Sequence, residues 1–112
     1  MNLDDEILID DEMRAALDNH FLGRDGVTSG DQFGGVSYLL NGQPFAILME
    51  GVVALRLAPQ NIQHALTLAG VSPFRPPSLD DPIRGWVQFV MLLPEDVLVL
   101  EAWYDLAMEQ VK

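Results

Sequence analysis

The chain contains no cysteine, and its 112 residues include only six basic side chains against seventeen acidic ones. The absence of cysteine excludes disulfides, thiolate metal ligands and a cysteine nucleophile. The opening sequence Met-Asn-Leu-Asp-Asp-Glu lacks the positive charge with which a secretory signal peptide begins. Every apolar run is far too short to cross a bilayer. We therefore expect a cytoplasmic protein that makes no use of a membrane.

The shortage of basic residues leaves a formal net charge of -11. A surface with this charge repels the phosphates of nucleic acids, whose binding requires several lysine or arginine contacts. Aromatic residues are also few, and they do not alternate with basic residues as a stacking surface for single strands requires. We therefore expect no direct binding of nucleic acid. The charge either keeps the chain soluble or suits a basic protein partner.

Residues that could carry chemistry are scarce as well. The two histidines, His20 and His64, fall on different expected helices, so we assign neither a catalytic nor a metal role. The acidic runs at 4–6 and 10–12 lack the alternating spacing and the glycine turn of a calcium loop. The sequence contains no Gly-x-Ser-x-Gly motif. We therefore predict a protein that is not an enzyme and that has no metal and no cofactor.

One segment comes close to a phosphate-binding loop. Residues 30–37 have the spaced glycines and the serine of that motif, but Val36 stands where the lysine is needed. The segment also leads into a strand, whereas the motif needs a helix whose N-terminus faces the phosphate. We interpret Phe33, Gly34 and Gly35 as a structural turn at the start of a strand, with the glycines allowing close backbone packing.

The sequence does have a high hydrophobic content, 49%, and well-placed turn residues. Asn41-Gly42 between two apolar runs predicts a type I′ hairpin that joins strands at 35–40 and 43–50. Gly51 then turns the chain into a strand at 52–57, and a further strand is expected at 86–93. Residues 23–32 and 72–85 are expected to be loops, with residues 73–75 as an optional edge strand.

Three helices are expected around these strands. The first spans residues 2–22 with Asn2 as its N-cap, although the β-branched run before Asp10 also allows a break there. The second runs from Pro59 to Gly70, and the third runs from Pro94 to the C-terminus. The chain is therefore predicted to be one α+β domain, residues 1–112, in which an antiparallel sheet of four to five strands packs with the helices.

Alternation along the strands predicts the two faces of the sheet. We expect the helices to cover one face, whose residues are Phe45, Ile47, Met49, Val53, Leu55, Leu57, Val87, Phe89 and Met91. The last helix is expected to dock through Val99, Leu100, Trp103, Leu106 and Ala107, and to expose an acidic stripe of Glu101, Asp105 and Glu109.

The opposite face is then too apolar for a surface in water. Its residues form a candidate interaction surface: Leu39, Leu48, Trp86, Val90 and Leu92, together with Arg56, which faces solvent, pairs with Glu50 or binds a carboxylate of a partner. We predict that a second copy covers this surface in a two-fold dimer. A partner protein, or the first helix crossing to that side, is the alternative.

An ordered set of short motifs is similar to the N-terminal domain of the TfoX family of competence regulators. The set comprises Phe33-Gly34-Gly35, Asn41-Gly42, Phe45-Ala46, Leu55-Arg56-Leu57, Ala69-Gly70, Pro73-Phe74, Pro94-Glu95 and Trp103, spread over residues 32–110. The resemblance implies a secretion-chaperone-like fold, with helices on a five-stranded antiparallel sheet, and many members are stand-alone domains without an established activity. The chain departs from the family at residues 30–32, which replace a basic residue and a methionine, and at residues 76–82, which replace a hairpin bearing lysine and glycine.

Three functions are compatible with this picture. The first is a small acidic regulatory or adaptor protein that acts by binding another protein, whose identity the sequence does not reveal. The second is a chaperone-like acidic homodimer that holds an extended segment of a client. The third is a small ligand-binding protein or enzyme that uses the turn at Phe33-Gly34-Gly35.

Overall fold

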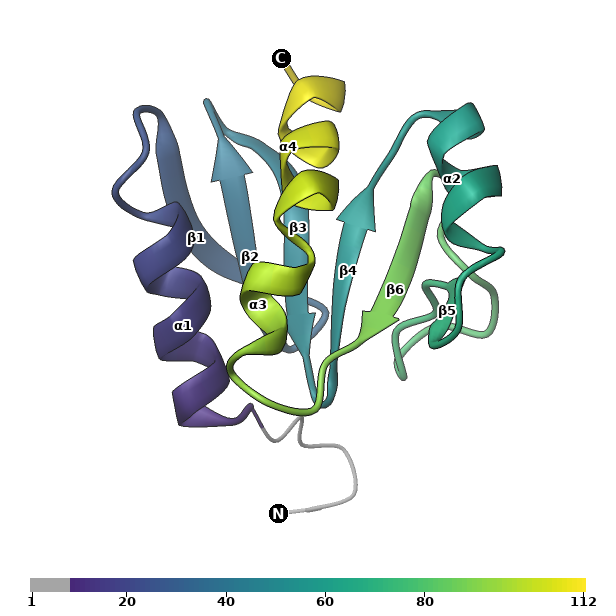
Figure 1. Ribbon diagram of the computed structural model, residues 1–112, viewed down its shortest axis with the longest axis horizontal. Coiled ribbons are helices and arrows are strands. Elements are labelled where there is room, and N and C mark those ends of the chain that lie inside the picture. The colour runs from purple at the N-terminus through teal and green to yellow at the C-terminus, as the bar shows by residue number, and fades with distance from the viewer. Residues whose placement is uncertain (1–8) are drawn as a thin grey trace.

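A computed structural model describes residues 9–112, in which six antiparallel strands form one sheet and four helices pack against it (Figure 1). The strands follow the spatial order β1-β2-β3-β4-β6-β5. Their bounds are β1 Val27–Gln32, β2 Gly35–Leu40, β3 Gln43–Met49, β4 Val52–Arg56, β5 Val71–Pro73 and β6 Trp86–Val90. The helices are α1 Asp11–Phe21, α2 Pro59–Ala65, α3 Asp96–Val99 and α4 Glu101–Gln110. The α+β class is confirmed, with more strands and helices than the sequence predicted.

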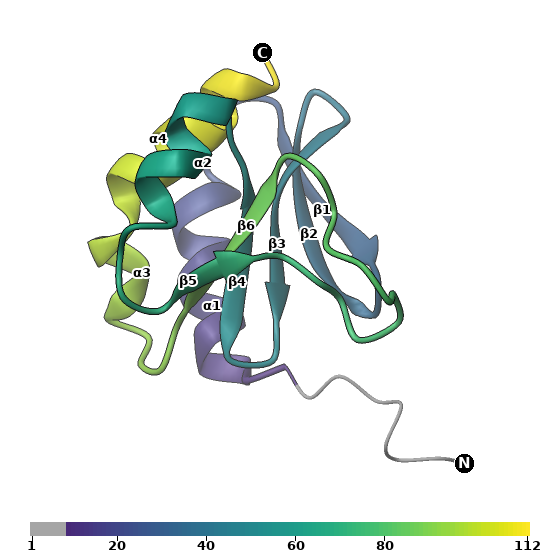
Figure 2. The ribbon, with the colours of Figure 1, turned by 90° about the vertical axis from the view of Figure 1, so that its right-hand side faces the viewer.

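The four helices lie on one side of the sheet, and residues 74–85 lie on the other (Figure 2). Helices α1 and α4 supply the large buried side chains of the helix side, among them Phe21 and Tyr104. The ring of Phe21 lies 5.0 Å from that of Tyr38, 5.1 Å from that of Phe45 and 5.0 Å from that of Tyr104, measured between ring centroids. The main core therefore joins α1, α4 and the middle of the sheet.

Helix α1 begins at Asp11 because Asp10 caps it. The Asp10 carboxylate accepts hydrogen bonds from the amides of Glu12 at 2.8 Å and Met13 at 3.1 Å, which satisfies two of the free amides at a helix start. The expected cap at Asn2 lies outside the described residues. Within the described chain, the helix places Met13, Leu17 and Phe21 on its buried face at intervals of four residues.

Two two-residue turns with positive φ angles join the first three strands. Asn41 (φ 50°) and Gly42 (φ 85°) form the predicted turn between β2 and β3. Phe33 (φ 53°) and Gly34 (φ 84°) form a second such turn between β1 and β2. The prediction of a loop at 23–32 was therefore wrong for residues 27–32. Strand β1 is a polar edge strand, which pairs through its backbone and needs few apolar side chains.

A β-bulge at Phe45 changes which residues of β3 face the helices. Leu39 pairs with Pro44, but Tyr38 pairs with Ala46, so Phe45 is an extra residue in β3. Phe45 and Ala46 both join the helix-side core, and the alternation continues from Ala46. Ile47 and Met49 consequently lie on the other face, and the prediction that they share the side of Phe45 was wrong.

That other face is covered by residues 74–85, which connect β5 to β6 (Figure 2). A second cluster comprises Ile47, Met49, Ala54 and Phe74, with Phe33, Val52, Ile83 and Trp86 packed around it. The Ile83 amide donates to the Phe74 carbonyl at 2.8 Å and closes the loop at its base. The face is therefore neither bare nor covered by the first helix, because α1 lies on the side of α4.

The C-terminal region forms two helices where one was expected. The break falls at Leu100, and it shifts the face that α4 turns toward the sheet. Tyr104, Ala107 and Met108 are buried, whereas Val99 and Leu106, which were predicted to dock, are 76% and 38% exposed. The predicted acidic stripe at Glu101, Asp105 and Glu109 is confirmed as exposed.

Candidate functional site

The candidate interaction surface predicted from the sequence does not form one surface. Leu48 is 1% exposed in the helix-side core, so its assignment to the surface was wrong; the bulge reverses the face on which it lies. Leu39 and Trp86 are half-buried. Arg56 is exposed and lies opposite Trp86 at the start of β6, whereas Val90 lies at the end of that strand. The ion pairs within residues 9–112 include neither Arg56 nor Glu50.

A pocket of about 330 Å³ lies beside the C-terminal end of β6. The turn between α2 and β5 forms one wall, the end of β6 forms another, and α3 with the start of α4 forms the third. Asp96 is the one charged residue in its lining, which comprises Leu68, Ala69, Gly70, Val71, Phe89, Val90, Leu92, Asp96, Val99, Leu100 and Trp103. We call this feature the β6 pocket.

Gly70 sets the wall between α2 and β5. Its φ of 78° falls in the left-handed region, which favours glycine, and its carbonyl accepts a hydrogen bond from the Val90 amide at 3.0 Å. The turn that begins at the end of α2 is therefore attached to the end of β6. This attachment places the side chains of Leu68 and Val90 at the same opening.

Asp96 sets the opposite wall. Its carboxylate accepts hydrogen bonds from the amides of Leu92 and Leu93, each at 2.9 Å. These bonds fold the chain back directly after β6 and start α3, which places Val99 beside Leu92 at the pocket. The carboxylate thus has two backbone partners. These bonds fix the shape of this wall of the pocket.

Trp103 supplies the aromatic wall of the pocket. Its ring lies 5.5 Å from the ring of Phe89 in β6 and 5.6 Å from the ring of His64 in α2, between centroids. The indole is half-buried and lines the pocket, so its fluorescence is sensitive to occupation of the pocket.

The rim of the β6 pocket holds Leu92 and Val99, the two most exposed of the large apolar side chains within residues 9–112. Leu92 and Val99 are each 76% exposed, Val90 is 48% exposed and Leu68 is 40% exposed. Leu93 follows Leu92 in the chain and is 59% exposed, and Leu98 precedes Val99 and is 66% exposed. Sequence reasoning selected Val90 and Leu92 but missed the others. The available signal was the run Val97-Leu98-Val99-Leu100, which is more apolar than one buried face of a helix requires.

The turn at Phe33-Gly34-Gly35 packs closely against its neighbours. Phe33 packs toward Phe74, with ring centroids 6.3 Å apart. A Cβ atom on Gly35 would collide with the Leu48 carbonyl oxygen and the Met49 sulfur, so the backbone of the two strands is in close contact there. The segment is a hairpin turn whose glycine allows this close approach.

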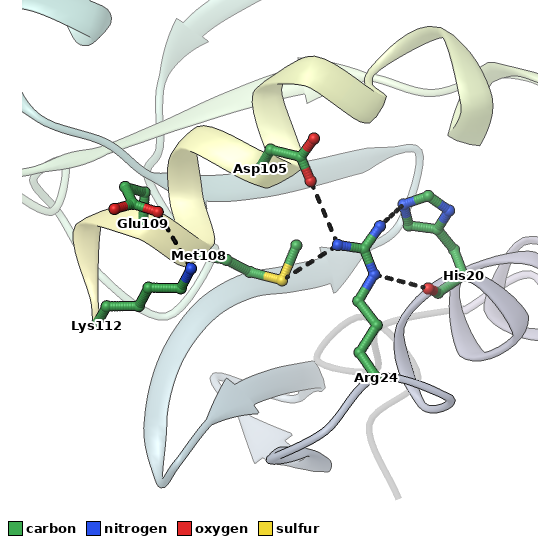
Figure 3. A network of polar contacts seen from close by, with 6 residues as sticks. All are labelled: His20, Arg24, Asp105, Met108, Glu109 and Lys112. Atoms are coloured by element: carbon green, nitrogen blue, oxygen red, sulfur yellow. Dashed lines mark hydrogen bonds and ion pairs between the residues drawn. The ribbon is translucent and has the colours of Figure 1, made fainter.

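A polar network joins α1 to α4 on the helix side (Figure 3). The Arg24 guanidinium donates to Asp105 at 3.3 Å and lies 3.2 Å from the Nε2 atom of His20. Burial, and then the charge of Arg24, lower the pKa of His20, while Glu101 and Asp105 act in the opposite direction. Two bases thus pair with the acidic stripe: Arg24 with Asp105 at 3.3 Å and Lys112 with Glu109 at 3.2 Å.

Among residues 9–112, no three side chains of His, Cys, Asp or Glu come together as metal ligands would. Burial raises the pKa of Tyr38 and of Tyr104 above the ordinary value of a phenol, so neither hydroxyl ionises near neutral pH. What the geometry offers is an apolar pocket with an exposed apolar rim.

No helix within residues 9–112 combines the length and the apolar character needed to span a membrane. Comparisons of the chain with protein-family models, with curated proteins and with solved structures gave no match. The resemblance to the TfoX N-terminal domain therefore stays a prediction from short motifs, and the function has to be argued from the β6 pocket.

Proposed function

We propose that this chain is a small acidic adaptor or regulatory protein that binds another protein through the β6 pocket. The carrying observation is the exposed apolar rim formed by Val90, Leu92 and Val99 around an apolar hollow. Exposed apolar side chains that gather at one place mark interaction sites, because their burial against a partner is favourable. The pocket can receive an apolar anchor side chain, as the centres of protein interfaces commonly do.

The lining favours a protein partner over a small molecule. A volume of about 330 Å³ lies at the small end of ligand pockets, which also need several convergent polar groups for specificity. Asp96 is the one charged side chain in the lining, and two backbone amides already bond to its carboxylate. A partner's leucine or phenylalanine needs no such groups.

The proposal includes neither catalysis nor direct contact with nucleic acid. The net charge of -11 opposes the counterion release that drives binding to a duplex. A role in transcription, if the resemblance to competence regulators holds, then requires a partner that itself binds DNA. A mobility-shift titration with duplex DNA at modest salt should show no complex at micromolar protein.

The chaperone-like homodimer remains the second candidate, and the same apolar rim supports it. A second copy seated on the β6 pocket would bury Leu92 and Val99, whereas the sheet face first expected to form the dimer already lies under residues 74–85. The third candidate, a ligand site at Phe33-Gly34-Gly35, loses support because Gly35 is packed against β3.

Site-specific photo-cross-linking in living cells tests the proposal. A photoreactive amino acid replaces Val99 at the rim or, as a matched control, Leu79, an exposed residue on the other side of the sheet. We expect a defined adduct with another protein from position 99 and not from position 79. Adducts between two copies of the chain would favour the homodimer, and equal adducts from both positions would contradict the assignment of the site.

A further inference from the structure

The sheet edge beside the β6 pocket is poorly suited to bind a partner as an added strand. Strand β5 has three residues, and its register with β6 turns the backbone groups of Val71 and Pro73 outward. Proline has no amide hydrogen, so this edge offers a partner strand one donor, at Val71. Strand addition depends on a row of backbone hydrogen bonds. The partner must therefore dock mainly through side chains.

The electrostatic surroundings of the pocket are acidic. Its lining contains Asp96 and no basic residue. Glu95, the chain neighbour of Asp96, is exposed, and the chain as a whole has a net charge of -11. Arg56 lies opposite Trp86, at the other end of β6. From Trp86 to Val90 the strand spans roughly 13 Å, so Arg56 is well separated from the pocket.

We propose that the segment recognised by the β6 pocket is an amphipathic helix whose polar flanks carry lysine or arginine; this inference rests on the proposed function of the pocket. Apolar side chains one helical turn apart enter between Val90, Leu92 and Val99. The flanking positive charges face Asp96 in the lining and Glu95 beside it in the chain. Helix-in-groove binding uses side chains alone, and acidic surroundings select against acidic helices of equal apolarity.

The tryptophan in the pocket provides the readout. In the variant Trp86→Phe the remaining tryptophan is Trp103, which lines the pocket. The protein is titrated with three synthetic peptides of about 18 residues, or five helical turns, that lack tryptophan and tyrosine. One is an amphipathic leucine and lysine helix, the second has glutamate in place of lysine, and the third has the leucine and lysine composition in scrambled order.

We expect the amphipathic lysine peptide to shift the emission of Trp103 to shorter wavelength in a saturable way. The glutamate and scrambled peptides should bind at least roughly tenfold more weakly. Val99→Asn, which changes no charge at an exposed residue, should weaken binding of the lysine peptide by about tenfold. Leu79→Asn is the matched control and should leave the affinity unchanged. Thermal unfolding verifies that each variant is folded.

The outcomes separate the inference from the proposed function. Equal binding of the lysine and glutamate peptides would overturn the assignment of a basic partner while supporting the apolar pocket. No response to any peptide, together with a specific adduct from position 99, would overturn the helix and leave the function standing. Loss of binding in Leu79→Asn rather than Val99→Asn would overturn the site. A shift of Trp103 emission with protein concentration alone, with a dimer mass in sedimentation, would assign the pocket to a second copy.

Discussion

Both faces of the sheet contain fully buried side chains, but different kinds of structure cover them. Leu55 on the helix side and Ile47 on the other side are both 0% exposed. Leu55 lies under helices, which satisfy their backbone hydrogen bonds within themselves. Ile47 lies under the irregular segment 74–85. The buried fraction of a side chain therefore does not reveal the free energy needed to open the segment that covers it.

The difference predicts two levels of stability within one sheet. The loop contributes two side chains, Phe74 and Ile83, to the cluster beneath it. Its base is closed by bonds from the Ile83 amide to the Phe74 carbonyl, at 2.8 Å, and from the Phe74 amide to the Trp86 carbonyl, at 3.3 Å. Segments held by few apolar contacts open locally at lower free energy than the core. We expect the loop side to open before the helix side.

The largest effect is expected from Phe21→Ala on the helix side. Phe21 is 0% exposed and packs against rings from β2, β3 and α4, so its removal leaves a cavity that no single element can fill. The free energy of unfolding should fall by about 4 kcal/mol. Urea denaturation measures this loss. A loss under about 1 kcal/mol would show that α1 is a peripheral cover, like the loop.

Phe74→Ala is the matched change on the loop side. Phe74 is 1% exposed, but the loop that carries it can detach, which limits the loss to about 2.5 kcal/mol. Trp86, whose ring lies 6.2 Å from that of Phe74, should become accessible to acrylamide at urea concentrations below the main transition. The background Trp103→Phe isolates its signal. Loss of Trp86 protection only at global unfolding would contradict the two levels of stability.

Gly35→Ala introduces a methyl group where the loop side meets the β2–β3 hairpin. The new Cβ would collide with the Leu48 carbonyl and the Met49 sulfur, and overpacking of this kind costs about 1.5 kcal/mol. Gly23→Ala is the control, because a Cβ there meets nothing within 4 Å. Thermal melts of the two variants provide the comparison. Equal melting temperatures would mean that β3 shifts away from β2 without cost.

The smallest effect is expected from His20→Gln in the polar network of the helix side. Because the folded protein lowers the pKa of His20 below its usual 6.5, the unfolded chain binds the proton more readily. The contribution of His20 to stability is therefore complete above that usual value and is lost as the pH falls through the lowered one. Between about pH 7.5 and pH 5.5, the native protein should lose more thermal stability than His20→Gln.

The matched control for this experiment is His64→Gln on α2. His64 is exposed beside Trp103 and lies outside the network of Arg24. Loss of the pH dependence in this variant rather than in His20→Gln would contradict its assignment to His20. A native pH dependence in His20→Gln would mean that His20 takes up its proton equally in the folded and unfolded chains.

Local signals in the sequence predicted the parts of the fold that depend on local chemistry. Asn41-Gly42 specified its turn because few residue pairs adopt two positive φ angles in succession. Alternation placed Val87, Phe89 and Met91 correctly in the helix-side core. The start of α2 at Pro59 and the bounds of β2 also agree with the sequence prediction.

The features that were missed depend on partners distant in the sequence. The bulge at Phe45 is invisible in β3 alone, since it appears only in the pairing with β2. Strand β1 is too polar to be recognised without its neighbour. The β6 pocket requires Gly70, Asp96 and Trp103 to come together from three separate elements. Sequence reasoning therefore identified two residues of the rim but not the hollow between them.

The bulge also has a consequence for how β3 finds its place among its neighbours. Residues 45–49 are all buried, so a slip by one residue would exchange one apolar set for another, without the polar side that normally forbids such a slip. The extra residue breaks this equivalence, because one alignment alone places Phe45 and Ala46 together in the helix-side core. The bulge thus fixes the register of β3, a central strand without a polar face. Deletion of Phe45 should produce several competing registers rather than a shorter version of the same sheet.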